Sequence, residues 1–221
     1  MWQIVRSLSI RHKSFMMIIA MGELTFIKED TFMGYTIEHV TKQGVQTSDI
    51  YSYEFQEKRR IRLTGEVDDV MAEGVVAAIQ YLDSVSDKEI EVIINSPGGS
   101  VTAGLAILDA MKEARSDIRT VCIGLGASMG ALLVTCGGTK GKREIYPNAE
   151  MMIHQPLGGA LGQASDVQLT AVHLTKVKKN LVHLLAEATG KSPKKIIHDI
   201  DRNLWLDAQD AVAYGLVDRI R

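Results

Sequence analysis

The chain has 221 residues, of which 46% are hydrophobic and 24% are charged, and this length fits one well-buried domain better than two. Its 25 Lys and Arg residues nearly balance its 27 Asp and Glu residues, which gives a net charge of -2. Without an overall positive charge or a basic stripe, the sequence excludes a protein that holds nucleic acid through its general field.

Residues 1–33 are interpreted as an N-terminal extension, propeptide or disordered segment, and residues 34–221 as one domain. Residues 1–22 are basic and contain the apolar run Phe15 to Met21. That run is shorter than the roughly 20 apolar residues that span a membrane, so no membrane segment is expected. A weak export or transit signal, or translation upstream of a later start such as Met33, would also explain it. We expect the segment to be disordered or removed in the working particle.

From Gly34 on, strand-like and helix-like segments alternate, which predicts an α/β domain. Three successive β-branched residues in the second strand indicate burial on both faces, as in parallel sheets. Gly190 predicts a left-handed helix end. The predicted strands cover 61–67, 90–95 and 118–124, with two more near Glu144 and Met151. The predicted helices run from Asp68 to Ser84 and over 103–114, 166–189, 192–199 and 207–214.

The segment Gly126-Ala127-Ser128-Met129-Gly130 joins a predicted strand to a helix. Small neighbours permit a sharp turn that exposes the Ser128 hydroxyl at a helix start, as in the nucleophile elbow of hydrolases. Free N–H groups at that helix start would favour a developing oxyanion. The alternative is a serine that caps the helix, which is the common use of Ser at such a position.

A second glycine-rich junction, residues 96–100, is predicted at the same edge of the sheet, where α/β folds place ligands. Two such loops side by side could form an oxyanion hole from the N–H groups of Gly99 and Met129. The alternative is a tight turn followed by a helix cap at Ser100. Neither loop has the spacing of a phosphate-binding P-loop.

His154 is the candidate general base, because it alone among the six histidines ends a predicted apolar strand directly before a loop. A third group could orient its imidazole, and spacing does not choose among the candidates. These are Asp199, Asp201, Asn203 and Asp207.

Cys122 and Cys136 lie in or near apolar runs, without CxxC spacing or a nearby His pair. They are interpreted as free buried thiols of a protein in a reducing compartment, which predicts a cytoplasmic location. We expect neither a disulfide, a metal site nor a cofactor.

Long segments of the sequence resemble the proteolytic subunit of the Clp protease, the ClpP family, over roughly residues 37–221. The segments that carry this resemblance are SDIYS (48–52), INSPGGSVTAG (94–104), IGLGASMGA (123–131), KGKREIYPNAEMMIHQPLGGALGQASD (140–166) and YGLVD (214–218).

The resemblance implies the α/β spiral of strand-strand-helix units shared with crotonases, with a protruding handle helix from Asp166 that interleaves between rings. It implies a serine endopeptidase assembled as two stacked heptameric rings, into which an AAA+ unfoldase feeds unfolded polypeptide. Ser128 would be the nucleophile and His154 the base, with Gly99 and Met129 as oxyanion donors. The backbone around Gly158 and Gly159 would pair with substrate as an added strand.

The sequence also departs from the family pattern. The triad Asp of the family falls on Asn203, whereas the pair that locks ring to ring is kept as Asp201-Arg202. Two positions of the groove that docks the unfoldase, usually aromatic, are Glu91 and Glu113. A hydrophobic partner would desolvate these carboxylates without pairing them, so we expect poor docking by this chain alone.

Three functions fit these observations. The first is a Ser-His-Asn peptidase in a homogeneous or mixed assembly, and the second is a weak or non-catalytic ring subunit that works with a second ClpP paralogue. The third is a crotonase-type acyl-CoA enzyme, which would not need both Ser128 and His154 and which absence of CoA binding would exclude.

Overall fold

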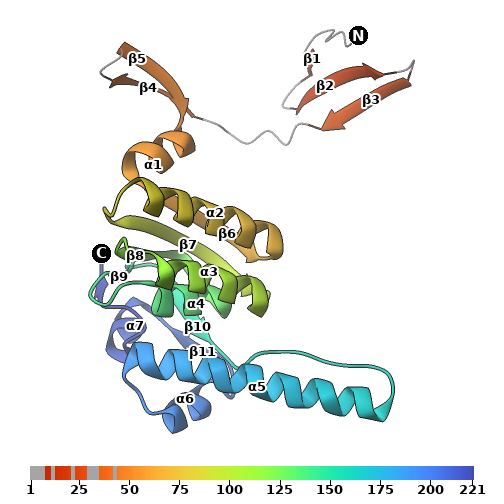
Figure 1. Cartoon of the computed structure of the whole chain (residues 1–221), viewed down its shortest axis with the longest axis vertical. Coiled ribbons are helices and arrows are strands. Elements are labelled where there is room, and N and C mark those ends of the chain that lie inside the picture. Colours follow the sequence, from red (N-terminus) through yellow and green to blue (C-terminus); the bar gives the residue numbers. More distant parts are fainter. Residues whose placement is uncertain (1–7, 11–12, 21–22, 29–34, 42–43) are drawn as a thin grey trace. The chain divides into compact units, whose positions relative to one another are not determined.

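The computed structural model describes residues 8–10, 13–20, 23–28, 35–41 and 44–221, and the chain divides into the compact units Met1–Tyr53 and Glu54–Arg221 (Figure 1). In the first unit, an antiparallel sheet contains β1 (Leu8–Ile10), β2 (Lys13–Ala20) and β3 (Glu23–Lys28). A separate antiparallel pair contains β4 (Thr36–Thr41) and β5 (Gly44–Asp49), and α1 (Ile50–Lys58) follows.

The predicted division into an extension over 1–33 and a domain over 34–221 stays a prediction. The boundary between the two compact units falls after Tyr53, twenty residues further along the chain than the predicted boundary after residue 33. Residues 1–7, 11–12, 21–22 and 29–34, which include the start Met33 considered above, lie outside the described residues.

The second unit contains a mainly parallel sheet, which confirms the expected α/β class. Its main path has the order β11-β10-β8-β7-β6, and only the pairing of β10 with β11 on this path is antiparallel. Beside it, β9 pairs in parallel with both β8 and β12. The strands are β6 (Arg60–Val67), β7 (Ile90–Gly99), β8 (Ile118–Ala127), β9 (Arg143–Ile145), β10 (Glu150–Ile153), β11 (Leu204–Leu206) and β12 (Arg219–Ile220).

The strand β7 continues through Ser96 to Gly99, which the sequence predicted to be a turn, whereas β8 ends at Ala127, directly before the predicted turn at Ser128. The register with β8 shifts after Ile94, so that Ser96 pairs with Gly126, and the register with β6 shifts after Asn95, so that Gly99 pairs with Val67. Irregularities of this kind bend a strand and redirect its end. The carboxyl ends of β7, β8 and β10 therefore meet at one edge, and Gly99, Ser128 and His154 lie there.

Helices α2 (Asp69–Val85) and α3 (Val101–Glu113) pack against each other, and α2 also contacts β6 and β7 (Figure 1). Side chains at the residue before each helix cap it: Asp68 accepts from the N–H of Met71, and Ser100 accepts from that of Ala103. The predicted caps are thus confirmed, and the buried faces of both helices join the core formed by the sheet strands.

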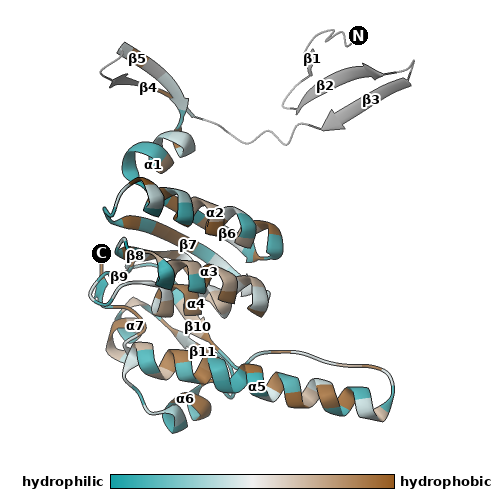
Figure 2. Cartoon of the chain, in the orientation of Figure 1, coloured by the Kyte–Doolittle hydropathy of each residue, from teal (hydrophilic) through white to brown (hydrophobic). Residues whose placement is uncertain are grey.

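Helix α5 (Ala164–Thr189) ends at Gly190, whose φ of 73° confirms the predicted left-handed cap. Hydrophobic and hydrophilic residues alternate along it (Figure 2). Leu181, Val182, Leu185 and Ala186 are buried in its second half. Its first half reaches beyond the rest of this unit (Figure 1) and leaves large apolar side chains such as Leu169 and Val172 exposed. Two short helices complete the unit, α6 (Pro193–Asp199) and α7 (Ala208–Tyr214).

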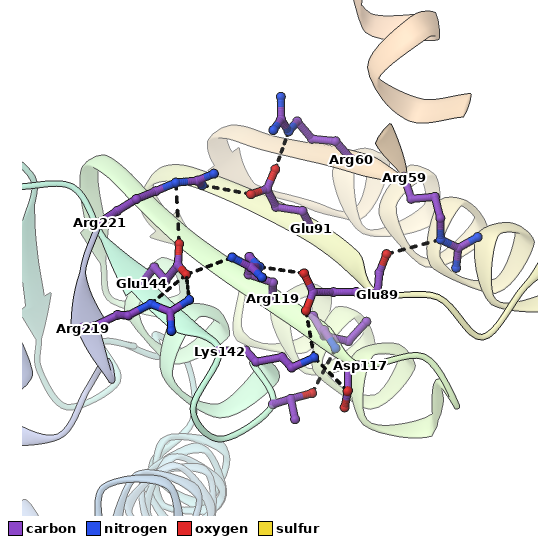
Figure 3. A network of polar contacts seen from close by, with 12 residues as sticks. Arg59, Arg60, Glu89, Glu91, Asp117, Arg119, Lys142, Glu144, Arg219 and Arg221 are labelled. Atoms are coloured by element: carbon purple, nitrogen blue, oxygen red, sulfur yellow. Dashed lines mark hydrogen bonds and ion pairs between the residues drawn. The ribbon is translucent and has the colours of Figure 1, made fainter. Parts of the chain in front are cut away.

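A network of ion pairs crosses the sheet near the amino-terminal ends of β6, β7 and β8, away from the edge where Ser128 lies (Figure 3). At its centre, Glu144 of β9 has a side chain that is 2% exposed. It pairs with Arg119 of β8 at 3.0 Å, with Arg221 at 3.6 Å, and with Arg219 of β12. Because a buried carboxylate is stable only when it is paired, these arginines hold β12 on the sheet.

Both cysteines, Cys122 and Cys136, are free and buried, as the sequence predicted. Burial raises the pKa of each thiol to about 12. Both therefore stay protonated and unreactive near neutral pH. Among the residues that the structure describes, no helix is long and apolar enough to cross a membrane.

Candidate active site

Ser128 has a strained backbone at the turn between β8 and α4 (Met129–Leu132). Its φ of 54° and ψ of −119° lie in a region that residues with a Cβ rarely adopt, at a cost of roughly 1–3 kcal/mol. The hydrogen bond from its N–H to the carbonyl of Met152 on β10, at 2.8 Å, holds this turn. The conformation is that of a nucleophile elbow.

Glycines make room for the elbow. A Cβ on Gly98 would lie 2.6 Å from the Cβ of Ser128 and 2.8 Å from the carbonyl oxygen of Ala127. A Cβ on Gly130 would lie 2.8 Å from the carbonyl oxygen of Ser96. Two backbones can therefore approach this closely only because both positions are glycine.

The imidazole of His154 lies beside the Ser128 hydroxyl. The distance between His154 Nε2 and Ser128 Oγ is 2.9 Å, within hydrogen-bond range. The Ser128 side chain makes no capping bond to α4, so the interpretation of this serine as a helix cap is wrong. Its partner is the base candidate that the sequence singled out.

A pocket of about 250 Å³ opens at this pair. Ser128, Met129, His154 and Gly99 line it on the side of the sheet edge. The other walls are mainly apolar and come from β7, β10, α3, α4, α5 and the segment after β10: Pro97, Val101, Leu132, Met152, Ile153, Pro156, Leu157, Leu181 and Leu185.

The two residues predicted to supply oxyanion donors both lie at this pocket. Met129 is the first residue of α4, where an N–H has no partner within the helix. Ser100 donates its N–H to the carbonyl of Val67 on β6, at 2.7 Å. Gly99, the last residue of β7, directly precedes Ser100 and lines the pocket. Both predicted oxyanion donors thus line the same pocket as Ser128.

Three of the four candidates for the third position have other partners. Partial burial acts to raise the pKa of Asp199, but hydrogen bonds from Lys195, Tyr214 and His198 outweigh it and lower that pKa to about 2. The carboxylates of the other two lie elsewhere: that of Asp207 caps α7, and that of Asp201 lies 3.5 Å from Gln155 and 3.9 Å from Arg202.

Asn203 lies next to His154 by register. The last pair of the β10–β11 ladder is Ile153 with Leu204, so His154 and Asn203 are each one residue beyond it. Asn203 is exposed, and among the described residues no hydrogen bond joins its side chain to His154. Both residues thus directly follow the last pair of the ladder, and the bond of a completed triad is not formed between them among the described residues.

Gly158 and Gly159, the positions predicted to hold substrate, do not line the pocket, whereas Pro156 and Leu157 earlier in the same loop do. A Cβ on Gly158 would lie 3.3 Å from Leu174 of α5, whereas Gly159 is open. The sequence interpretation missed the contribution of α5 to the pocket. Leu181 and Leu185 are four residues apart in the sequence, which gives them one helix face, but nothing in the sequence shows that this face adjoins the serine.

Gly98→Ala is expected to slow any reaction of Ser128 by at least about 100-fold, because the added Cβ displaces the elbow from His154. The matched control is Gly74→Ala in α2, where a Cβ meets no atom within 4 Å. The rate of acylation by a fluorophosphonate measures the effect, and thermal unfolding shows whether the variant is folded. A folded Gly98→Ala protein with the normal rate would contradict this account of the elbow.

A strained serine, an adjacent imidazole and the N–H at the start of α4 lie at one pocket, which is the geometry of a serine hydrolase site. The family model described as Clp protease matches residues 42–221, and the chain therefore belongs to the Clp protease family. The fold is accordingly the ClpP-type α/β fold that the resemblance implied, and the chain is a ClpP-type peptidase.

The expectation that Glu91 weakens docking of an unfoldase stays a prediction. Within the chain this carboxylate is already paired, because Arg60 of β6 and Arg221 bind it, the latter at 2.9 Å (Figure 3). Its partners lie 31 and 130 residues away along the chain, so no local pattern could reveal them. Glu113, at the end of α3, is exposed as expected.

Proposed function

We propose that the chain is a serine endopeptidase that hydrolyses unfolded polypeptide, with Ser128 as nucleophile and His154 as general base. The observation that carries this proposal is the 2.9 Å distance between Ser128 Oγ and His154 Nε2 at a strained elbow. A structural serine would not need this costly backbone conformation, which a nucleophile uses to present its hydroxyl.

In the first half of the reaction, Ser128 Oγ attacks the peptide carbonyl carbon while its proton moves to His154 Nε2. The N–H groups of Gly99 and Met129 stabilise the negative charge that develops on the carbonyl oxygen. The C–N bond then breaks, and the imidazolium gives its proton to the departing amine. The Ser128 ester and the released fragment are the products of this half.

In the second half, water attacks the ester carbonyl and gives its proton to His154. The C–O bond to Ser128 breaks, Oγ takes the proton back, and the second fragment leaves as a carboxylic acid. As proposed, both halves of the reaction need only side chains and backbone groups of the chain, with neither a metal ion nor a cofactor.

The walls of the pocket favour a substrate with an apolar side chain before the scissile bond. Val101, Leu132 and Leu181 line it, and a charged side chain among them would lose its hydration without a partner. The irregular segment around Gly158 and Gly159 binds the substrate backbone as an added strand. This mode of binding makes the peptidase tolerant of sequence outside the pocket.

The working particle in this proposal is two stacked heptameric rings that enclose the active sites, supplied by an AAA+ unfoldase in the cytoplasm. The exposed first half of α5 is the handle between rings. Asp201 and Arg202 are both largely exposed and only 3.9 Å apart, so they are free to bind across the ring contact. Native mass spectrometry of the chain, alone and with a second ClpP subunit, distinguishes homogeneous from mixed assemblies.

A weakly active or non-catalytic ring subunit is the second candidate. Asn203 favours it, because its amide brings no negative charge and makes no bond to His154 among the described residues. In such a particle, a paralogous subunit would carry most of the activity.

Labelling with a fluorophosphonate separates the two candidates. We expect the probe to modify Ser128 in the assembled protein, because His154 activates that hydroxyl, and peptide mass mapping identifies the residue. Ser100, an ordinary helix cap in the neighbouring loop, is the internal control and should stay unmodified. An assembled particle whose Ser128 remains unlabelled would be the non-catalytic subunit.

A further inference from the structure

The turn between α6 and β11, residues 200–203, is tied to the residue that follows His154. The backbone N–H of Gln155 donates to the carbonyl of Ile200 at 2.8 Å, and its side-chain Nε2 donates to the carbonyl of Asp201 at 2.9 Å. One residue thus holds two successive carbonyls of the turn that ends at Asn203.

Lys178 of α5 sets the orientation of the Gln155 amide. Its Nζ lies 2.7 Å from Gln155 Oε1. An ammonium group can only donate, so this bond requires the amide oxygen to face Lys178 and the amide nitrogen to face Asp201. Both side chains are half-buried, where such bonds are stronger than in water. Without Lys178, the amide could rotate and lose its bond to the turn.

The register explains why the turn needs this restraint. A regular continuation of the β10–β11 ladder beyond Ile153 and Leu204 would pair Gln155 with Arg202. Gln155 instead bonds to Ile200 and Asp201, so Arg202 and Asn203 lie in an excursion outside the ladder. The excursion is fixed at one end by Leu204 in β11 and at the other end by Gln155.

We propose that Gln155, oriented by Lys178, is a positioning residue that holds Asn203 beside the imidazole of His154. The role rests on the proposed function, since Asn203 matters only when His154 acts as a base. An asparagine can present either its amide oxygen or its NH₂ group to the imidazole, and only the oxygen accepts the N–H that fixes the productive tautomer. Restraint of the turn limits which of these two groups Asn203 can present to the imidazole. Lys178 links the turn, through Gln155, to α5.

The test measures acylation of Ser128 by a fluorophosphonate in the assembled protein. We expect Gln155→Ala to lower the rate about 10-fold, because the amide of Asn203 loses its placement. Lys178→Met should lower the rate about threefold, the worth of one hydrogen bond. In an Asn203→Ala background, Gln155→Ala should have no further effect, because its role acts through Asn203. The matched control is Gln80→Ala, an exposed glutamine of α2.

Hydrogen exchange of the peptide that covers residues 200–205 gives a readout that needs no catalysis, and it should rise in Gln155→Ala but not in Gln80→Ala. Gln155→Glu keeps the bond to Lys178 but loses the donor to Asp201. Exchange of this peptide should therefore rise in Gln155→Glu as it does in Gln155→Ala. Unchanged exchange, or effects of Gln155 and Asn203 that add, would overturn the inference. A wild-type Ser128 that never reacts would instead overturn the proposed function, and exchange would still decide whether Gln155 holds the turn.

Discussion

Ser128→Ala is expected to abolish peptide hydrolysis by the assembled protein, with a loss of at least about 10³-fold in kcat. His154→Ala should cause a similar loss, because the two groups act as one unit at 2.9 Å. The double variant should then be no slower than either single variant. Cleavage of a short fluorogenic peptide with an apolar residue before the bond measures the effect.

The controls for this experiment are Ser84→Ala and His183→Ala. Both side chains are exposed, on α2 and on the second half of α5. Each should keep full activity. Hydrolysis that persists in a Ser128→Ala particle free of contaminating peptidase would show that Ser128 is not the nucleophile.

Asn203→Asp is expected to raise peptide hydrolysis by the isolated protein. An aspartate fixes the histidine tautomer and stabilises the imidazolium formed when the serine loses its proton, whereas an asparagine supplies no charge. In serine proteases of the trypsin type the reverse change lowers kcat by about 10⁴, roughly 5.5 kcal/mol of barrier. We expect a smaller gain here, about 10- to 100-fold, because the restrained turn already favours the accepting amide oxygen.

The matched control for this change is Asn180→Asp, an exposed position on α5 that should leave the rate unchanged. Native mass spectrometry must accompany the assay, because Asn203 adjoins Arg202 at the proposed ring contact. Equal or lower activity in a correctly assembled Asn203→Asp particle would show that another residue fills the third position, or that the site is inactive for a different reason.

The sequence predicted well those features that depend on neighbouring residues. The small residues around Ser128 indicated a sharp turn, Asp68 and Ser100 indicated helix starts, and Gly190 indicated a left-handed end. Each depends on local backbone sterics or on one hydrogen bond within a few residues. These are the conditions under which a sequence pattern determines local structure.

Features that depend on distant partners could not be predicted. Pro97, Gly98 and Gly99 indicated a turn, yet β7 continues through them because β6 offers paired positions after a register shift. Glu91 looked like an isolated carboxylate until Arg60 and Arg221 were placed beside it. Tertiary pairing decides both outcomes, and such pairing has no signature within a single segment.

Burial of Glu144 has a consequence for the order in which a nascent chain can fold. During synthesis Arg119 emerges 25 residues before this carboxylate, but Arg219 emerges 75 residues after it. Until then, closing the sheet around Glu144 would bury a charge with only part of its compensation. Domains can begin to fold while they leave the ribosome, N-terminal parts first. Glu144 of β9 is fully paired only after β12 has been synthesised and has joined the sheet. We therefore expect incompletely synthesised chains to retain an open sheet edge beside β9.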